Sequence, residues 1–287
     1  MKVNVKKLLI SLTVIMFGSF LISGLIFLAI GGLSSVVINA GQTRASKVFP
    51  AAEITQINVN TVNTDINIIP VAADKDIKVD FYGNAATSLA GKVPELLANQ
   101  EGGVLNIAIN YPNVAVLGFL NAAPLRLDIY VPQEFSRGIN VETISGALNI
   151  RKLNLENFEF KSSSGHLEAD SVVSSNIKIK STSGEVALND VEGNIEISNI
   201  SGNVNMVLRS FSKDLNIKTI SGAVTVSLPD KSEFNFALNS VSGSIENEFG
   251  AQIQFADGRK IEGTVGQSAK LLAVNTTSGD IKIKKGE

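Results

Sequence analysis

The residues that could carry catalysis are few and scattered along this sequence of 287 residues. His166 is the one histidine, and Cys and Trp are absent. A nucleophilic triad would join His166 to a serine and an acid, and glycoside cleavage would need a pair of carboxylates. The acidic candidates, all of which we expect in solvated loops, are Asp170, Asp190, Glu192, Asp214, Asp230 and Glu233.

The serines recur in a way that indicates structure instead of chemistry. Seven Ser-Gly dipeptides lie between residues 145 and 279, and the first six of them follow one another at intervals of 19, 19, 18, 20 and 21 residues. A fixed period near twenty is typical of repeat architectures. The dipeptides are Ser145-Gly146, Ser164-Gly165, Ser183-Gly184, Ser201-Gly202, Ser221-Gly222, Ser242-Gly243 and Ser278-Gly279.

No serine is singled out within this series, so we interpret all seven as structural. His166 follows Gly165 at a position where the other repeats carry Ala, Glu, Asn, Ser or Asp. We therefore expect it to be exposed and without a catalytic role. The sequence also lacks a phosphate-binding glycine loop and a repeated Asp-rich calcium motif. We predict no catalytic, cofactor-binding or metal-binding residues, and no cofactor.

The residues around each Ser-Gly predict a corner between two short strands. Large apolar residues stand six and four positions before the Ser, as in Ile195 and Ile197, which is the alternation of a strand with one buried face. A small polar residue always stands two positions before the Ser. After the Gly the apolar phase slips by one, to Leu148, Val186 and Val204 for example. Such a slip would expose the buried face unless the backbone bends there, and Gly tolerates the bend.

Stacked units of this kind predict an all-β fold, a β-solenoid that resembles a parallel β-helix with rungs of about 19 residues. A β-sandwich with coincidental Ser-Gly turns is the alternative. In the solenoid the small polar residues lie one above another, and we expect them to hydrogen-bond each other or the backbone of the corner. These residues are Thr143, Ser162, Ser181, Asn199, Thr219, Ser240 and Thr276.

The N-terminal region predicts one transmembrane helix ahead of the solenoid. Residues 1–7 contain three lysines, and no residue between Leu8 and Ile38 is charged. At about 1.5 Å per residue this stretch exceeds a hydrocarbon core of roughly 30 Å. A cleaved signal peptide is the alternative, but its apolar region would be shorter, about 7–15 residues. The expected organisation is a cytoplasmic tail (1–7), an anchor region (8–38), a linker (39–50) and an extracytoplasmic domain (51–287).

The start of this domain is less regular than the repeats. Residues 57–60 and 66–69 alternate around Thr64-Asp65, which resembles a degenerate corner. We expect a short helix around Pro94 to Ala98, and a loop over the end of the solenoid from the uncharged residues Val114 to Ala123. The net charge of -2 and the scattered Lys and Arg give no reason to expect nucleic acid as a partner.

The part of the chain from about Ala51 to Glu287 resembles the bacterial putative-adhesin family, whose domain has no assigned function. The resemblance rests on the strand pair around Ile57 to Ile69, on Leu127-Asp128-Ile129-Tyr130-Val131-Pro132, and on the Ser-Gly series that ends at Ser278. It implies a right-handed β-solenoid, often tethered to a membrane and in some Gram-positive members linked to cell-envelope stress. The family defines no catalytic residues.

These observations favour a non-enzymatic interaction module at the cell envelope, acting in adhesion or envelope-stress signalling. Its expected partners are the membrane, through the N-terminal helix, and an envelope protein or surface polymer. A polysaccharide-active enzyme on the same scaffold is the alternative.

The lysines of residues 1–7 predict a cytoplasmic N-terminus and an outer C-terminal domain. Protease added to intact spheroplasts should therefore remove the chain beyond Gly41 and leave a membrane-protected N-terminal fragment. Full protection of the C-terminal domain would contradict this topology.

Overall fold

The computed structural model describes residues 40–72, 74–86, 93–111 and 125–286, and these residues form an all-β fold. Most of its strand pairs are parallel. A 3₁₀ turn spans Ala51–Glu53. The strands are β1 (Ala40–Pro50), β2 (Gln56–Thr61), β3 (Asp65–Val71), β4 (Asp76–Ala86), β5 (Glu95–Glu101), β6 (Val104–Asn110), β7 (Arg126–Pro132), β8 (Gly138–Thr143), β9 (Leu148–Ser162), β10 (Leu167–Ser183), β11 (Val186–Ser201), β12 (Val204–Leu208), β13 (Leu215–Ser221), β14 (Val224–Pro229), β15 (Phe234–Ser242), β16 (Ile245–Asn247), β17 (Gln252–Ala256), β18 (Lys260–Val265), β19 (Leu271–Ser278) and β20 (Ile281–Gly286).

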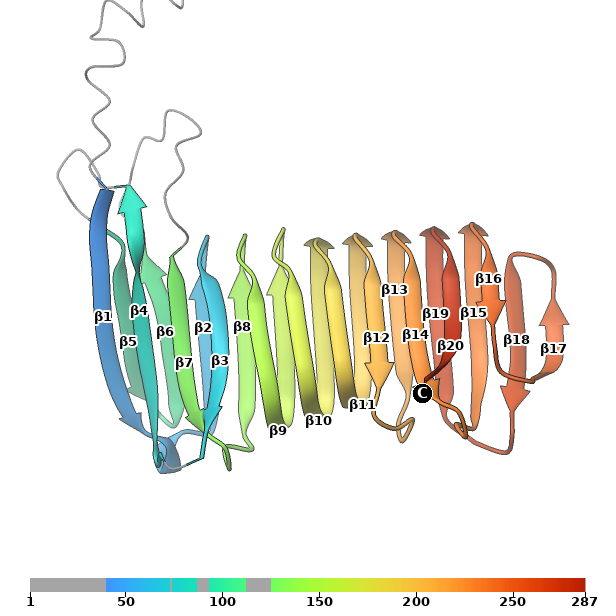
Figure 1. Ribbon diagram of the computed structural model, residues 1–287, viewed down its shortest axis with the longest axis horizontal. Helices are drawn as coiled ribbons and strands as arrows, with labels where there is room; N and C mark the ends of the chain where they lie inside the picture. The colour runs from blue at the N-terminus through green and yellow to red at the C-terminus, as the bar shows by residue number, and fades with distance from the viewer. Residues whose placement is uncertain (1–39, 73, 87–92, 112–124, 287) are drawn as a thin grey trace, which may run out of the picture. The chain divides into compact units, whose positions relative to one another are not determined.

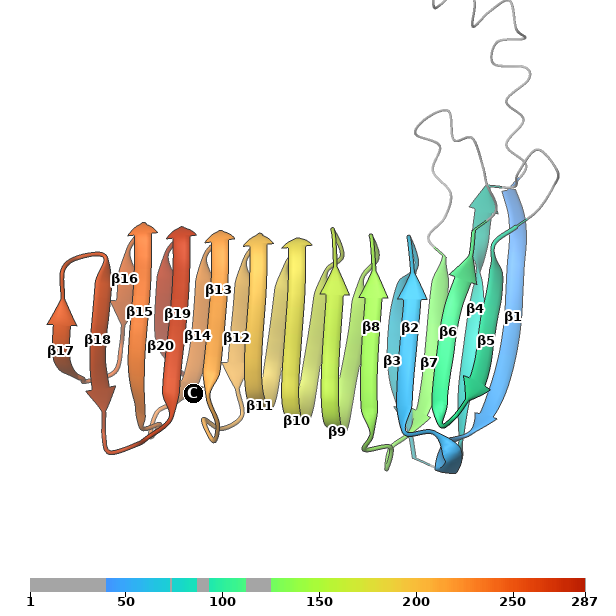
Figure 2. The ribbon, with the colours of Figure 1, turned by 180° about the vertical axis from the view of Figure 1, so that it is seen from behind.

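Two sheets meet at the Ser-Gly corners and enclose the core between them. The strands that lead into the corners form what we call the first sheet, in which β6, β2, β8, β9, β10, β11, β13, β19 and β15 follow one another. The strands that leave the corners form the second sheet, in which β7, β3, β9, β10, β11, β12, β14, β20 and β16 follow one another. Figures 1 and 2 show the stack from opposite sides.

The long strands β9, β10 and β11 contribute to both sheets because each bends within its length. Lys152, Ser171 and Asp190 occupy successive rungs at this bend and have positive φ values of 51°, 55° and 53°. The strand pairing continues on either side of the bend because neighbouring rungs turn at the same place. Asp170, Asp190 and Glu192 consequently lie in strands, and our expectation that they lie in loops was wrong.

The predicted inward residues form the core. Phe158, Phe160, Ile177, Ile179 and Ile197 are all buried, as are Leu148, Val186 and Val204 after the corner. The predicted one-residue slip in phase therefore occurs at the bend that Ser-Gly provides. In every rung with a Ser-Gly corner, the Gly lies in the break between one strand and the next.

The glycines of the corner are required by the distance between rungs. A Cβ added to Gly202 would collide with the carbonyl oxygen of Gly184, and one added to Gly222 would collide with that of Gly202. Gly202 also has a positive φ of 119°, which L side chains rarely adopt. The corner therefore excludes any side chain at this position, both by contact with the rung before it and by its backbone conformation.

The small polar residues before the corner are buried, except for the half-buried Ser162. Thr61 donates to Thr143 over 3.0 Å, Asn199 Nδ2 donates to the carbonyl oxygen of Gly202 over 3.0 Å, and Ser240 donates to that of Gly279 over 2.9 Å. The expected ladder of hydrogen bonds is incomplete, however. Among the described residues, the hydroxyl oxygens of Ser181, Thr219 and Thr276 have no hydrogen-bond partner.

The C-terminal repeats do not stack in chain order. Strand β19 pairs with both β13 and β15, so the rung of Ser278-Gly279 lies between those of Ser221 and Ser242. Before it, β18 pairs antiparallel with β15, and β17 pairs with β18. The chain thus adds a hairpin to the free edge of β15 and returns to fill the rung that it had passed over. Covering an open edge in this way limits pairing with other chains.

The N-terminal end of the stack differs from the sequence expectation in two elements. Residues 40–50 form strand β1, which pairs with β4, where we had expected a linker. Thr43 and Lys47 also bond carbonyl oxygens of Pro94 and Ala98. The charges and the proline that suggest a linker are equally typical of a protected edge strand. The expected helix near residues 94–98 is instead part of β5, because antiparallel pairing with β6 buries Leu96.

The expected anchor (8–38) lies outside the described residues, as does the expected loop from Val114 to Ala123. Within the described ranges, no helix has the length and apolar character needed to cross a membrane. The degenerate corner at Thr64-Asp65 is confirmed, since the break between β2 and β3 stacks directly on Gly146.

The corner and the core predict a rank order of stability losses in urea melts. Gly202→Val should be the most damaging change, because its side chain would collide with backbone. Ile197→Ala should leave a cavity that costs about 2–5 kcal/mol. Glu196→Gln should change the free energy of unfolding by less than about 0.5 kcal/mol, since its pair with Lys178 is exposed and 3.9 Å long. A melt in which Glu196→Gln ranked first would contradict the inward and outward assignment.

Candidate functional site

A groove of about 820 Å³ runs along the first sheet beside the Ser-Gly corner. It crosses β2, β8, β9, β10, β11 and β13, so it follows the stack and lies across the strands. Ala108 and Ile109 of β6 also line it at its N-terminal end. Its floor is the column of small polar residues two positions before each Ser, which includes Thr143, Ser181 and Thr219. The groove exists because these side chains are short and point inward, while the residues on either side point outward.

One wall of the groove is mainly aliphatic and stands at the position directly before each Ser. Ile144, Ile200 and Ile220 are 54%, 48% and 53% exposed, and Val62 of the first rung is also exposed. Ser163 and Thr182 occupy the same position on the two middle rungs. We will call this column the aliphatic wall. Isolated exposed aliphatic residues are ordinary, but a column of them along one groove is typical of an interaction surface.

The opposite wall carries lysines, at the position three residues before each Ser. Lys161 and Lys180 lie directly opposite each other on β9 and β10. Lys218 stands at the same position on β13, and Ser198 of β11 lies between it and Lys180. We will call this column the lysine wall. Lys161 pairs with Glu159 at 3.2 Å. Within the described part of the chain, neither Lys180 nor Lys218 forms an ion pair with a carboxylate.

His166 is held in a structural hydrogen bond on the other side of the corner. Its Nδ1 accepts the backbone N–H of Glu185 in the next rung at 3.1 Å. Asp65, Asn203 and Asp280 occupy the same column and accept the corresponding N–H in the same way. His166 is exposed, as expected, and it serves as one of a series of interchangeable acceptors that cap the corner.

The acidic candidates do not converge. Asp170 accepts from Asn189, and Glu192 accepts from Ser212. Asp214 and Glu233 accept backbone N–H groups of later residues, and Asp230 pairs with Lys285. Among the described residues, no three His, Asp or Glu side chains gather as metal ligands would. Each carboxylate is therefore engaged separately with a neighbouring rung or loop.

Asp190 forms the best-defined ion pair of the stack. The guanidinium of Arg209 donates to both carboxylate oxygens, at 3.0 and 2.6 Å, and Ser171 adds a third bond. The hydrogen bonds from Arg209, more than that from Ser171, hold the pKa of Asp190 below its usual range. Three of the roughly four acceptor sites of this carboxylate are therefore occupied by groups of the protein itself.

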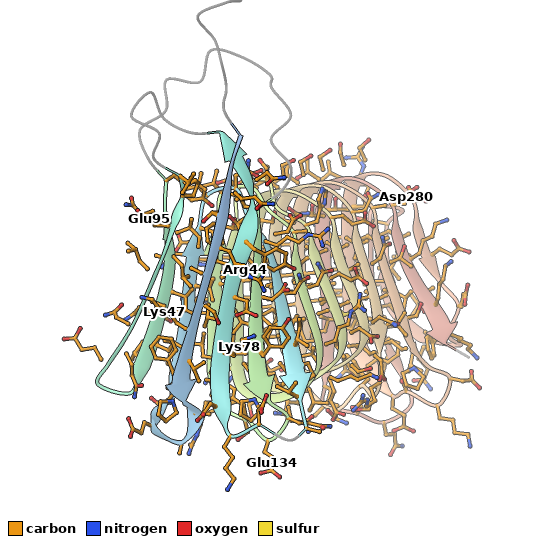
Figure 3. The ribbon with its side chains drawn as sticks, turned by 60° about the vertical axis from the view of Figure 1, so that its left-hand side comes forward. Arg44, Lys47, Lys78, Glu95, Glu134 and Asp280 are labelled. Carbon is orange, nitrogen blue, oxygen red and sulfur yellow. The ribbon has the colours of Figure 1, made fainter. Side chains whose placement is uncertain are left out.

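A second hollow of about 640 Å³ lies between β1, β4 and β7, and we had not predicted it from the sequence. Asp128 is buried there and accepts from Asn67 and Tyr82, which raises the pKa of the Tyr82 hydroxyl. Arg44 on β1 and Lys78 on the neighbouring strand β4, both labelled in Figure 3, also line this hollow. The alternating pattern of residues 78–82 places three polar side chains on one face of β4. The sequence does not show that this face lies beside Asp128, because that depends on the antiparallel pairing of β4 with β7.

The column of acceptors predicts how the structure responds to changes at His166. His166→Ala should lower the free energy of unfolding by at most about 1 kcal/mol. The N–H of Glu185 is exposed, so water can replace the imidazole as its hydrogen-bond acceptor. His166→Asn should restore most of that loss, because Asn203 fills the same role two rungs further along the same column. Urea melts of the two variants test this. Equal losses in both would show that the hydrogen bond contributes nothing.

The chain is similar to proteins of known structure, and the similarity covers nearly the whole length of those proteins. One is a putative cell adhesion protein from Clostridium sporogenes, at 19% identity over 86% of this chain and 100% of that chain, with a TM-score of 0.36. Another is a putative adhesin from Bacteroides fragilis, at 13% identity over 84% and 97%, with a TM-score of 0.44. No curated protein matches the chain. The pattern of the Toastrack DUF4097 family matches residues 54–284, and the chain therefore belongs to that family.

Proposed function

We propose that this protein is a non-enzymatic binding module of the bacterial cell envelope, and that the groove beside the Ser-Gly corner holds its partner. The observation that carries the proposal is the groove itself, which crosses six neighbouring rungs between a mainly aliphatic wall and a wall that carries three lysines. An extended partner can make similar contacts at each rung, so many weak contacts add up along the stack.

The proposed location is the outer surface of the membrane. The N-terminal sequence supports it, with lysines in residues 1–7 followed by the uncharged stretch from Leu8 to Ile38. A helix there would tether the domain and keep the groove close to the envelope. Adhesion and envelope-stress signalling are the two roles that such a tethered binder can serve.

The enzymatic alternative finds little support in the arrangement of the side chains. An active site needs a distinct, converging set of groups. The six acidic candidates are engaged separately, and His166 is bonded to the backbone of the next rung. The groove floor offers repeated Ser, Thr and Asn side chains, none of which is paired with a base.

Photo-crosslinking in living cells tests the proposed groove. A photoreactive amino acid at position 200, in the aliphatic wall, should give a discrete crosslinked product. The same residue at position 207 on β12 is the matched control, since Val207 is exposed on the second sheet to a similar degree. Equal products at both positions, or none at either, would contradict a binding role for the groove.

Turnover assays test the enzymatic alternative. We expect the purified protein to leave peptidoglycan, teichoic acid and common polysaccharides unchanged. Reproducible turnover that disappears in His166→Ala or Asp190→Asn would replace the binding proposal by the enzymatic one.

A further inference from the structure

The two walls of the groove are chemically different and run side by side along the stack. Residues two apart in a strand are about 6.4–6.8 Å apart, so the lysine wall and the aliphatic wall are separated by roughly that distance. Successive rungs are about 4.8 Å apart, which makes the six-strand groove about 24 Å long. An occupant must therefore be extended and must present different chemistry to its two sides.

The lysine wall favours an anionic side on the occupant. Lys161 and Lys180 are opposed in register, and like charges that face each other across strands are destabilising. Among the charged residues that line the groove, Glu142 is the one acid, at the N-terminal end, against Lys161, Lys180 and Lys218. Carboxylates placed along this wall would relieve the repulsion and pair with the two lysines that have no ion pair in the described structure.

The aliphatic wall favours an apolar side on the same occupant. Ile144, Ile200 and Ile220 each leave about half of their surface exposed to water. Ser163 and Thr182 interrupt the wall in the middle of the groove, where their hydroxyls are available to an incoming backbone amide or carbonyl. Glycans and polymers of glycerol phosphate carry no aliphatic side chains, and would leave this wall uncovered.

An extended peptide meets both requirements because its side chains alternate between two sides. We propose that the groove binds an extended, acidic segment of a partner protein, with alternate acidic side chains against the lysine wall and aliphatic side chains against the aliphatic wall. This inference rests on the proposed role of the groove, and it adds the chemical class of the partner. Two features argue for it independently, namely the unneutralised lysines and the exposed isoleucines.

Fluorescence anisotropy with a labelled peptide of four Glu-Leu repeats and the full-length protein tests the inference. We expect saturable binding that weakens as salt is raised, since exposed ion pairs are screened. The double variant Lys180→Glu, Lys218→Glu should weaken binding at least tenfold, and Ile200→Ser, Ile220→Ser at least fivefold. Each changed side chain is exposed, so the variants should fold, and circular dichroism will verify this.

Matched controls separate the groove from general electrostatics and stickiness. Lys284→Glu on β20 and Val207→Ser on β12 change exposed residues of the second sheet, and each should alter binding less than twofold. A peptide of four Lys-Leu repeats should not bind. Equal weakening by Lys284→Glu would overturn the inference, and so would competition by a glycerol phosphate polymer as strong as that by unlabelled Glu-Leu peptide.

The test distinguishes failure of the inference from failure of the proposed function. If position 200 crosslinks a partner in cells while the Glu-Leu peptide does not bind, the groove is a binding site and the acidic peptide is the wrong class. If neither result is obtained, both proposals are wrong. A shift of the protein to a dimer that Ile200→Ser abolishes would instead identify a second copy as the occupant.

Discussion

The architecture depends on one close approach of backbone to backbone at the Ser-Gly corner. Each corner glycine lies against the carbonyl oxygen of the corner before it, through Thr64, Gly146, Gly165, Gly184, Gly202, Gly222, Gly279 and Gly243. A side chain at any of the seven glycine positions would push neighbouring rungs apart and break the hydrogen bonds of both sheets. This steric requirement fixes the register of the stack, aligns the polar columns beside the corner, and so creates a continuous groove.

Most of the fold could be predicted because the constraint is local and repeats. The alternation of apolar residues before each Ser and the small polar residue that follows it mark positions that, apart from Ser162, are buried in the structure. The slip in apolar phase after each Gly marks the bend between two strands. The exchange of the last two rungs could not be predicted, since β19 and β15 carry equivalent patterns and either could pair with β13. The longer interval between Ser242 and Ser278 was the one signal that the series is interrupted there.

The candidate site was only partly accessible from sequence. The position of His166 in a variable column correctly indicated an exposed residue, but its bond to Glu185 appears only when neighbouring rungs are placed. The lysines at positions 161, 180 and 218 lie in different repeats, and only in-register pairing brings them into one wall. The hollow around Asp128 was missed entirely, because it depends on antiparallel strands at the N-terminal end of the stack.

A stack of this kind suits recognition more readily than catalysis, for a physical reason. Each rung repeats the backbone geometry of the last, so groups at equivalent positions lie about 4.8 Å apart and point in the same direction. Catalysis needs unlike groups that converge on one atom, whereas an extended ligand needs like groups in series. The columns at the corner supply the second arrangement: isoleucines on one side, lysines on the other, and short side chains between them. Changing residues along a single column would therefore alter the chemistry of the proposed binding groove without disturbing the glycines on which the fold depends.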